Sequence, residues 1–123
     1  MVVDDDRTNT QLMQMVLEMD GYAVVVCPTV ERAQEAITGD THAFIIDYYL
    51  AGTTKGVALV NLVRAGDTAA AVDTPIIVTS GDDRRRNEAL RAGADLFLLK
   101  PYGPSILSTA LEQLLITDMT DSD

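Results

Sequence analysis

Short, continuous apolar segments alternate with helical patterns along the whole chain. The apolar segments are rich in Val and Ile and are bounded by polar or turn-forming residues, which is typical of buried strands. Between them, apolar residues recur at spacings of about three or four, the period of an amphipathic helix. The predicted strands are Val2–Val3, Ala23–Val26, Ala43–Ile46, Pro75–Val78 and Leu96–Leu99.

Five helical segments separate or follow these strands. Gly21, Gly39 and Gly93 come after three of the helices, and we interpret them as helix stops. Continuous apolar strands joined by helices predict a parallel sheet that is buried on both faces, and right-handed crossovers make it a doubly wound α/β domain. The helical patterns cover residues 12–19, 30–37, 57–63, 87–92 and 106–115.

The length of 123 residues fits one compact domain. We expect residues 1–116 to form this domain and residues 117–123 to be an acidic, flexible tail. No apolar segment approaches the roughly 20 residues of a membrane span, and the N-terminus lacks the basic flank and apolar stretch of a signal peptide. These features favour a cytoplasmic protein with no membrane partner.

The formal net charge of -10 narrows the range of partners. An acidic surface repels nucleic-acid phosphates and anionic lipids, so we expect no direct contact with either. The same acidity suits a protein that concentrates a divalent cation. A surface that is acidic for solubility explains the charge equally well, so the charge excludes partners without selecting one.

Polar side chains stand immediately after four of the five predicted strands. Because ligands of a doubly wound sheet bind at the carboxyl ends of its strands, we expect these side chains to converge on one edge. Several carboxylates beside one lysine and one hydroxyl form a divalent-metal site with room for a phosphoryl group. The residues are Asp4–Asp6 after the first strand, Asp47 after the third, Thr79–Ser80 after the fourth and Lys100–Pro101 after the fifth.

Each of these groups has a chemical role in such a site. Carboxylates that lie close together repel one another, and Mg2+ relieves the repulsion by taking oxygen ligands while it keeps several waters. A carboxylate also serves as a nucleophile toward phosphorus and forms an aspartyl phosphate. A lysine ammonium and a threonine hydroxyl then bind oxygens of the transferred group and stabilise its charge.

Four motifs in order resemble the response-regulator receiver domains of two-component signalling systems, over essentially the whole chain. Each motif alone is a weak signal, whereas all four at these separations are highly specific. The motifs are Val3–Asp6, Phe44–Asp47, Pro75–Gly81 and Gly93–Pro101.

The resemblance implies a set of metal and acceptor residues. Asp47 would be the phosphoacceptor and one ligand of Mg2+. Asp5 would be the main Mg2+ carboxylate, and Asp4 would act on the metal through water. The backbone carbonyl of Tyr49, two residues past the acceptor, would be a further metal ligand.

The resemblance also implies residues for the phosphoryl group and for the switch. Lys100 would be the phosphoryl-binding cation, and Thr79 would be the switch hydroxyl. Phe97 would be the aromatic side chain that changes rotamer with Thr79. Pro101 is similar to a family proline whose preceding peptide is usually cis.

Fold and partners follow from the same resemblance. It implies a flavodoxin-like fold with five helices and the strand order 2-1-3-4-5. It also implies a domain that catalyses its own phosphorylation and dephosphorylation rather than an enzyme with a separate substrate. The phosphohistidine donor would be a sensor histidine kinase or a histidine phosphotransfer protein. An effector domain or a second copy would bind the face of the fourth helix, fifth strand and last helix.

The chain departs from the family pattern at three places. Leu50–Gly52 replaces the Met-Pro that often follows the acceptor, in a loop about one residue longer. Tyr49 is aromatic where the family is commonly polar, and Gly81 offers no side chain two residues after Thr79. These departures bear on the rate of dephosphorylation.

Three other functions remain open at this level. The first is a receiver-like interaction module that no longer switches, against which the set of Asp5, Asp47, Thr79 and Lys100 argues. The second is a flavodoxin-like flavin binder, which would want hydroxyls and free N–H groups where this chain has three carboxylates. The third is a metal-dependent phosphatase, which would want a carboxylate at the position of Tyr49.

Several other residues receive ordinary structural interpretations. His42 stands before the third strand and is interpreted as a loop residue, and Cys27 as a packed or edge residue. The methionines at helical spacing are expected in the core. Arg84–Arg86 follows two aspartates, so we favour a solvated helix face over a binding site.

Overall fold

The computed structural model describes residues 1–50 and 54–121, with the side chains of residues 1–50 and 54–116. Strands and helices alternate from the N-terminus onward. The strands are β1 (Val2–Val3), β2 (Val26–Cys27), β3 (Phe44–Asp47), β4 (Ile76–Ser80) and β5 (Leu96–Leu99). The helices are α1 (Arg7–Met19), α2 (Val30–Ala36), α3 (Gly56–Arg64), α4 (Arg86–Ala92) and α5 (Pro104–Asp121), and a 3-10 turn over Asp83–Arg85 leads into α4.

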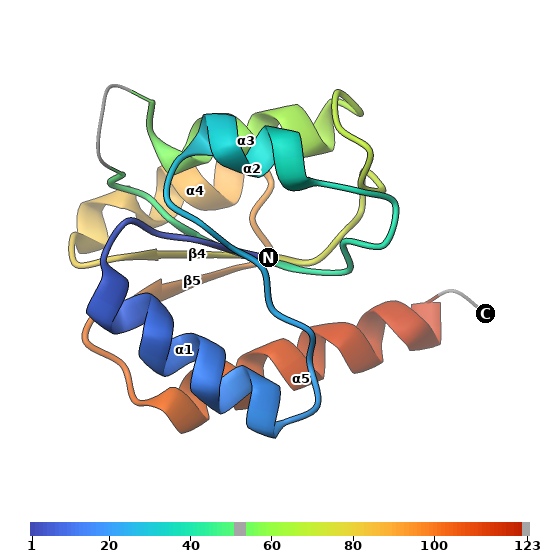
Figure 1. The fold of residues 1–123 in the computed structure, drawn as a ribbon. Helices are drawn as coiled ribbons and strands as arrows, with labels where there is room; N and C mark the ends of the chain where they lie inside the picture. The colour runs from blue at the N-terminus through green and yellow to red at the C-terminus, as the bar shows by residue number, and fades with distance from the viewer. Residues whose placement is uncertain (51–53, 122–123) are drawn as a thin grey trace.

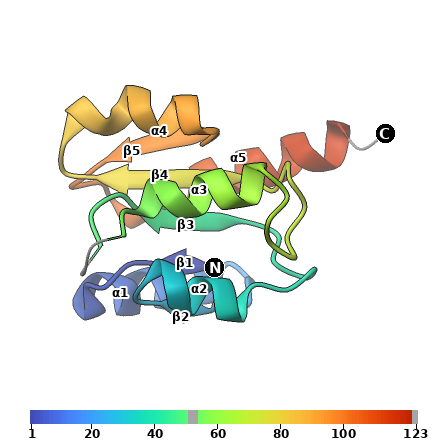
Figure 2. The same cartoon turned by 90° about the horizontal axis from the view of Figure 1, so that it is seen from above.

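A five-stranded parallel sheet forms the middle layer, with the strands in the order β2-β1-β3-β4-β5 (Figure 2). Helices α1 and α5 cover one face of the sheet, and α2, α3 and α4 cover the other (Figure 1). The predicted doubly wound α/β fold and its strand order are confirmed. Within the described residues, no helix has both the length and the apolar character of a membrane span.

The central strands bury side chains on both faces of the sheet, as their continuous apolar sequences predict. Alternate residues of one strand point to opposite faces, so Val3 and Ile46 pack under α2 and α3, whereas Val2 and Ile45 pack against α1 and α5. Two apolar layers therefore hold the sheet between its helices. Burial of this area is the main favourable contribution to the free energy of folding.

Side chains and glycine fix the ends of several helices. Asp6 caps α1, because its carboxylate accepts a hydrogen bond from the Asn9 N–H at 3.2 Å. Thr29 caps α2 through the Arg32 N–H at 3.1 Å. Gly93 ends α4 with a φ of 118°, a left-handed conformation that favours glycine. These residues fix where α1 begins after β1 and where α4 ends before β5.

The predicted bounds of the second strand were wrong. The sequence predicts a strand over Ala23–Val26, whereas β2 is only Val26–Cys27. Its partner β1 has two residues, so Val26 and Cys27 alone find register partners, and Pro28 follows at once. The β-branched residues before Val26 lead up to the sheet without continuing it.

The prediction that both faces of every strand are buried was wrong for β5. This strand lies at the edge of the sheet, and Leu99 is 41% exposed although it is apolar. The expectation that the methionines are core was also wrong for two of them. Met13 is buried, but Met15 and Met19 are 62% and 82% exposed, because α1 turns only a narrow stripe toward α5 and the sheet.

Two predictions concern segments at the limit of the described residues. Helix α5 continues to Asp121, and residues 122–123 lie outside the described part, so the tail over residues 117–123 stays a prediction. Ala51 and Gly52, which belong to the altered loop after the acceptor, also lie outside the described residues. Gly39 does not end α2, since the helix already ends at Ala36.

Gly56 begins α3 directly against the backbone of Asp47. A Cβ atom at this position would collide with the Asp47 carbonyl oxygen and would lie 2.7 Å from Cγ2 of Ile46. Since backbone cannot move aside as a flexible side chain can, we expect Gly56→Ala to lower the free energy of unfolding by about 1–3 kcal/mol. Urea unfolding measures the change. Gly81→Ala is the control, because a Cβ there meets nothing within 4 Å. Equal losses in both variants would contradict the proposed collision.

Candidate functional site

Three carboxylates meet at the carboxyl ends of β1 and β3. Asp4 and Asp5 follow β1, and Asp47 is the last residue of β3. One oxygen from each lies within 4.8 Å of the other two. Asp4 and Asp47 are buried, whereas Asp5 is exposed. The sheet therefore brings these three predicted residues together, as the argument from strand ends predicts.

Lys100 closes the cluster from the end of β5. Its Nζ lies 3.3 Å from Oδ2 of Asp47 and 3.4 Å from Oδ2 of Asp4. The peptide between Lys100 and Pro101 is cis. One ammonium group thus offsets one of the three formal negative charges of the carboxylates, and the site keeps a net negative charge.

Asp4 is already held by other donors. Its Oδ1 accepts a hydrogen bond from the Asp6 N–H at 2.9 Å, and its Oδ2 accepts one from the Asn9 side-chain amide at 2.9 Å. Asp5 carries no such hydrogen bond within the described residues and projects into solvent. The Asp6 side chain caps α1 and only its backbone N–H contacts Asp4, so the third aspartate of the motif is not a member of the carboxylate cluster.

Burial raises the pKa of Asp47 to about 6. Loss of hydration is the largest cause, Lys100 opposes it, and the negative charges of Asp4 and Asp5 reinforce it. A carboxylate with this pKa is mostly ionised at neutral pH, although its charge is costly there. A bound cation would remove that cost.

The raised pKa of Asp47 predicts how stability depends on pH. Its ordinary value is 3.8, so the native state binds the proton more tightly than the unfolded chain. Ionisation therefore destabilises the native state progressively as the pH rises from about 4 to about 6. In chelator, Asp47→Asn should gain up to about 3 kcal/mol at pH 7.5 and almost nothing at pH 4. Thermal or urea unfolding at both pH values measures this, and an equal gain at both would contradict it.

Thr79 and a residue that sequence reasoning missed complete the interior of the site. Thr79 is buried in β4 beside Asp47, and the two pair in register. The Tyr102 hydroxyl donates to Sδ of Met13 at 3.7 Å. Burial and the charges of Asp4 and Asp47 raise the pKa of Tyr102 to about 12, and the Thr79 side chain opposes the shift. Its position two residues after Lys100 is the one signal in the sequence that could have indicated it.

Phe97 is buried in this structure, inside the apolar layer under α4. The Arg86 guanidinium carbon lies 4.9 Å from the centre of its ring, close enough for a cation–π contact. The predicted solvated face over Arg84–Arg86 therefore holds for Arg84 and Arg86, whose side chains are 84% and 44% exposed, but not for Arg85, whose side chain is only 33% exposed.

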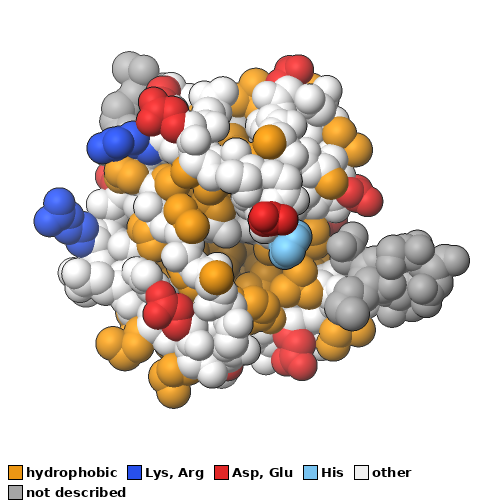
Figure 3. All heavy atoms as spheres, turned by 45° about the vertical axis from the view of Figure 1, so that its right-hand side comes forward, with side chains coloured by type: hydrophobic (Ala, Val, Ile, Leu, Met, Phe, Trp, Pro, Cys, Tyr) orange, Lys and Arg blue, Asp and Glu red, His pale blue; other side chains and the backbone are white. Residues whose placement is uncertain are grey.

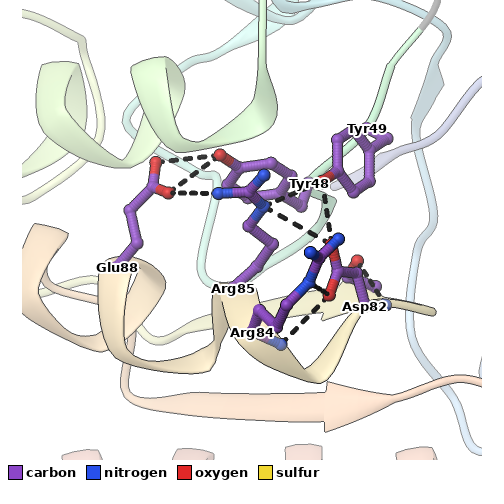
Figure 4. A network of polar contacts seen from close by, with 7 residues as sticks. Tyr48, Tyr49, Asp82, Arg84, Arg85 and Glu88 are labelled. Atoms are coloured by element: carbon purple, nitrogen blue, oxygen red, sulfur yellow. Dashed lines mark hydrogen bonds and ion pairs between the residues drawn. The ribbon is translucent and has the colours of Figure 1, made fainter.

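The two tyrosines after the acceptor point toward the start of α4 (Figure 4). The Tyr48 hydroxyl donates to the carboxylate of Glu88, with both oxygens at 2.9 Å. The Tyr49 hydroxyl donates to Oδ2 of Asp82 at 3.1 Å and accepts from Nε of Arg85 at 2.8 Å. Residues far apart in sequence thus join the loop after Asp47 to the segment after β4.

The opposite edge of the sheet carries different features. His42 is an exposed loop residue before β3, as predicted. It lines a hollow of about 530 Å³ together with Met1, Tyr22, Ala43 and Leu115. Figure 3 shows this face, where hydrophobic side chains gather around the hollow. The hollow lies at the amino ends of the strands and takes no part in the carboxylate cluster.

The donor set fits Mg2+. Mg2+ prefers oxygen ligands at about 2.1 Å, so opposite ligands of one ion stand about 4.2 Å apart. The three carboxylate oxygens lie within 4.8 Å of one another, and the exposed Asp5 is free to close the remaining gap. A hard cation with several retained waters suits such an open, partly exposed cluster.

Comparison with known proteins places the chain in a family. A family model of the response regulator receiver domain matches residues 1–112. Chemotaxis protein CheY1 of Helicobacter pylori is 30% identical over 123 residues, which cover 96% of this chain and 97% of that protein. The phosphate regulon transcriptional regulatory protein PhoB of Pseudomonas aeruginosa is 27% identical over 118 residues, which cover 94% of this chain. The chain spans about half the length of PhoB, since the match covers 50% of it.

Solved structures agree with this match. A putative response regulator from Chloroflexus aurantiacus has a TM-score of 0.84 and 30% identity, with 94% of each chain covered. A CheY-like receiver domain protein from Methanospirillum hungatei has a TM-score of 0.86 over 98% of this chain and 94% of that one, and at 22% identity it supports the fold alone. The chain belongs to the response regulator receiver domain family of two-component signalling systems.

Proposed function

We propose that the chain accepts a phosphoryl group on Asp47, in the presence of Mg2+, from a phosphohistidine donor. The observation that carries this proposal is the position of Asp47. It stands at a strand end, buried, with Lys100 Nζ at 3.3 Å and two further carboxylates within reach of one cation. A nucleophile, a cation for the phosphoryl oxygens and a metal-binding set therefore lie in one place.

The residues that would hold the metal are Asp5, Asp47 and the backbone carbonyl of Tyr49. Asp4 would act through a water, which agrees with the donors that already occupy both of its oxygens. Receiver domains in general bind Mg2+ at such an acidic pocket, where the ion neutralises charge on the phosphoryl oxygens.

The chain's own residues account for the remaining parts of the transfer. An oxygen of Asp47 attacks the phosphorus, and the bond from phosphorus to the donor's imidazole nitrogen breaks with its electron pair left on that nitrogen. Lys100 would bind a phosphoryl oxygen as its Nζ leaves its contacts with Asp4 and Asp47. Thr79 supplies a hydroxyl donor from the next strand.

The signal would then pass from Thr79 and Phe97 to an outer face. Phe97 is already buried, so the expected change in the ring is a repacking beneath α4 rather than entry from solvent. The face of α4, β5 and α5 carries the exposed apolar residues Leu90, Leu99 and Ile106, which suit a protein partner. We propose that an effector domain or a second copy of the chain binds there.

A direct phosphorylation assay tests the proposed function. The protein is incubated with Mg2+ and acetyl phosphate or phosphoramidate, and its intact mass is measured. We expect a gain of one phosphoryl group, which is lost when EDTA replaces Mg2+. No gain with either donor would favour the alternative of a receiver-like interaction module that no longer switches by phosphorylation.

We expect the phosphorylated form to lose its phosphoryl group slowly. Hydrolysis needs a water in line with the phosphorus, and the two positions from which a side chain could orient it are Tyr49 and Gly81. The Tyr49 hydroxyl is engaged by Arg85 and Asp82, and Gly81 has no side chain. One missing hydrogen bond to a transition state costs about 1–3 kcal/mol, which is roughly 5- to 150-fold in rate.

Tyr49→Asn combined with Gly81→Glu should therefore speed the decay. The position of Gly81 has space, because a Cβ there would meet nothing within 4 Å. Loss of phosphoprotein mass with time measures the rate, and Gly81→Ala, which adds no polar group, is the control. Unchanged or slower decay in the double variant would show that the side chains at these two positions do not limit hydrolysis.

A further inference from the structure

The two residues after Asp47 are anchored in different ways. Tyr48 is buried, and its backbone donates to the Thr79 carbonyl at 2.8 Å and accepts from the Gly56 N–H at 2.9 Å. Tyr49 is 44% exposed and, among the described residues, its backbone makes no hydrogen bond. Within the described part of the chain, the contacts that hold Tyr49 are therefore those of its side chain.

Arg85 is the residue that contacts the whole tyrosine pair (Figure 4). Its Nε donates to the Tyr49 hydroxyl at 2.8 Å, and its guanidinium carbon lies 5.8 Å from the Tyr49 ring centre and 5.3 Å from that of Tyr48. Its Nη1 lies 3.6 Å from Oε1 of Glu88, which accepts the Tyr48 hydroxyl. The two rings meet edge to face, with centres 4.6 Å apart. One guanidinium thus holds both rings against the start of α4.

The neighbouring Arg84 makes none of these ring contacts. It forms a two-point ion pair with Asp82, at 2.9 Å and 3.0 Å, and its side chain is 84% exposed against 33% for Arg85. The two arginines carry the same charge in the same turn of the chain. They therefore separate the effect of charge near the site from the effect of contact with Tyr49.

We propose that Arg85 is a positioning residue of the Asp47 site, which acts through the Tyr49 hydroxyl to hold the Tyr49 backbone in place for the metal. This inference rests on the proposed function, in which the Tyr49 carbonyl is a Mg2+ ligand. A ligand that is ordered before the ion arrives binds it more tightly, because less conformational entropy is lost on binding. Arg85 touches neither the ion nor the phosphoryl group.

The direction of the change in Mg2+ affinity distinguishes a positioning role of Arg85 from a simple effect of its charge. Removal of a positive charge near a cation site strengthens cation binding, so Arg84→Gln should leave Mg2+ affinity unchanged or slightly higher. Arg85→Gln removes the same charge and also the Arg85 contact with Tyr49, which leaves the Tyr49 hydroxyl with Asp82 alone. We expect Mg2+ to bind about 2- to 10-fold more weakly. Tyr49→Phe should show a similar loss. The double variant should lose no more affinity than Tyr49→Phe alone, because that change already removes the hydroxyl through which Arg85 acts.

Two measurements on the metal-free and Mg2+-titrated proteins test this. NMR titration gives the Mg2+ dissociation constant, and 15N relaxation gives the order parameter of the Tyr49 amide before metal is added. We expect Arg85→Gln to lower the order parameter of Tyr49, with that of Tyr48 preserved by its backbone bonds. Dispersed amide signals elsewhere confirm that each variant is folded.

The outcomes separate this inference from the proposed function. Equal Tyr49 order and equal Mg2+ affinity in Arg85→Gln and Arg84→Gln would overturn the positioning role. Additive losses in the double variant would also overturn it, since Arg85 would then act by another route. If the parent chain takes up no phosphoryl group while Tyr49 order still depends on Arg85, the proposed function fails and the positioning of Tyr49 stands.

Discussion

Replacement of Asp47 by Asn is expected to abolish phosphorylation of the chain completely. The amide keeps the size and the strand-end position of the side chain, but it has no anionic oxygen to attack phosphorus. Asp47 is buried in the cluster, and its Oδ2 lies 3.3 Å from Nζ of Lys100. Among the described residues, no other hydrogen-bond donor contacts its oxygens, and no other carboxylate of the cluster combines these features. Asp4 is occupied by the Asp6 N–H and the Asn9 amide.

Intact mass after incubation with acetyl phosphate and Mg2+ measures this result. The Asn variant should remain at the mass of the unmodified chain under conditions that label the parent. Its predicted higher stability at neutral pH guards against the trivial explanation that it is unfolded. Undiminished labelling of this variant would show that the acceptor is a different residue.

Replacement of Asp5 by Ala is expected to remove both Mg2+ binding and phosphorylation while the fold is retained. Asp5 is the exposed member of the cluster, so the change leaves the packed interior intact and relieves repulsion with two other carboxylates. Without this oxygen the metal would keep Asp47 as its only direct carboxylate. Mg2+ titration by NMR and phosphorylation followed by mass both measure the loss.

Asp6→Asn is a matched control for this variant. Asp6 stands next to Asp5 and is also acidic, but it caps α1 and lies outside the cluster. Asparagine caps a helix about as well as aspartate, so stability should be little changed. If Asp5→Ala still binds Mg2+ and is phosphorylated at the parent's rate, the metal assignment is wrong.

Strand-end residues were predictable because their positions follow from the backbone alone. Once the apolar segments are read as parallel strands, Asp47, Thr79 and Lys100 must meet at one edge, whatever their side chains do. The central strands β3 and β4 could be placed for the same reason, since both faces are covered and their sequences are apolar throughout. The family resemblance rests on these same residues.

Features that depend on side-chain contact across the fold could not be predicted. The pairing of Arg85 with Tyr49 spans 36 positions and depends on how α4 begins, which no local pattern encodes. Exposure of Met19 depends on how narrow a stripe of α1 meets α5. The short β2 follows from the two-residue length of β1. The strand propensity of Ala23–Val26 gives no information about that length.

The positions of the tyrosines make the site visible to spectroscopy. The chain has four tyrosines and no tryptophan, so its near-ultraviolet emission comes from tyrosine alone. Tyr48, Tyr49 and Tyr102 lie around Asp47, whereas Tyr22 lines the hollow at the other end of the sheet. Three of the four emitting rings therefore lie beside the acceptor, and Tyr22 lies away from it. We expect Mg2+ and phosphoryl occupancy to change tyrosine emission, so that both can be followed on the unlabelled protein.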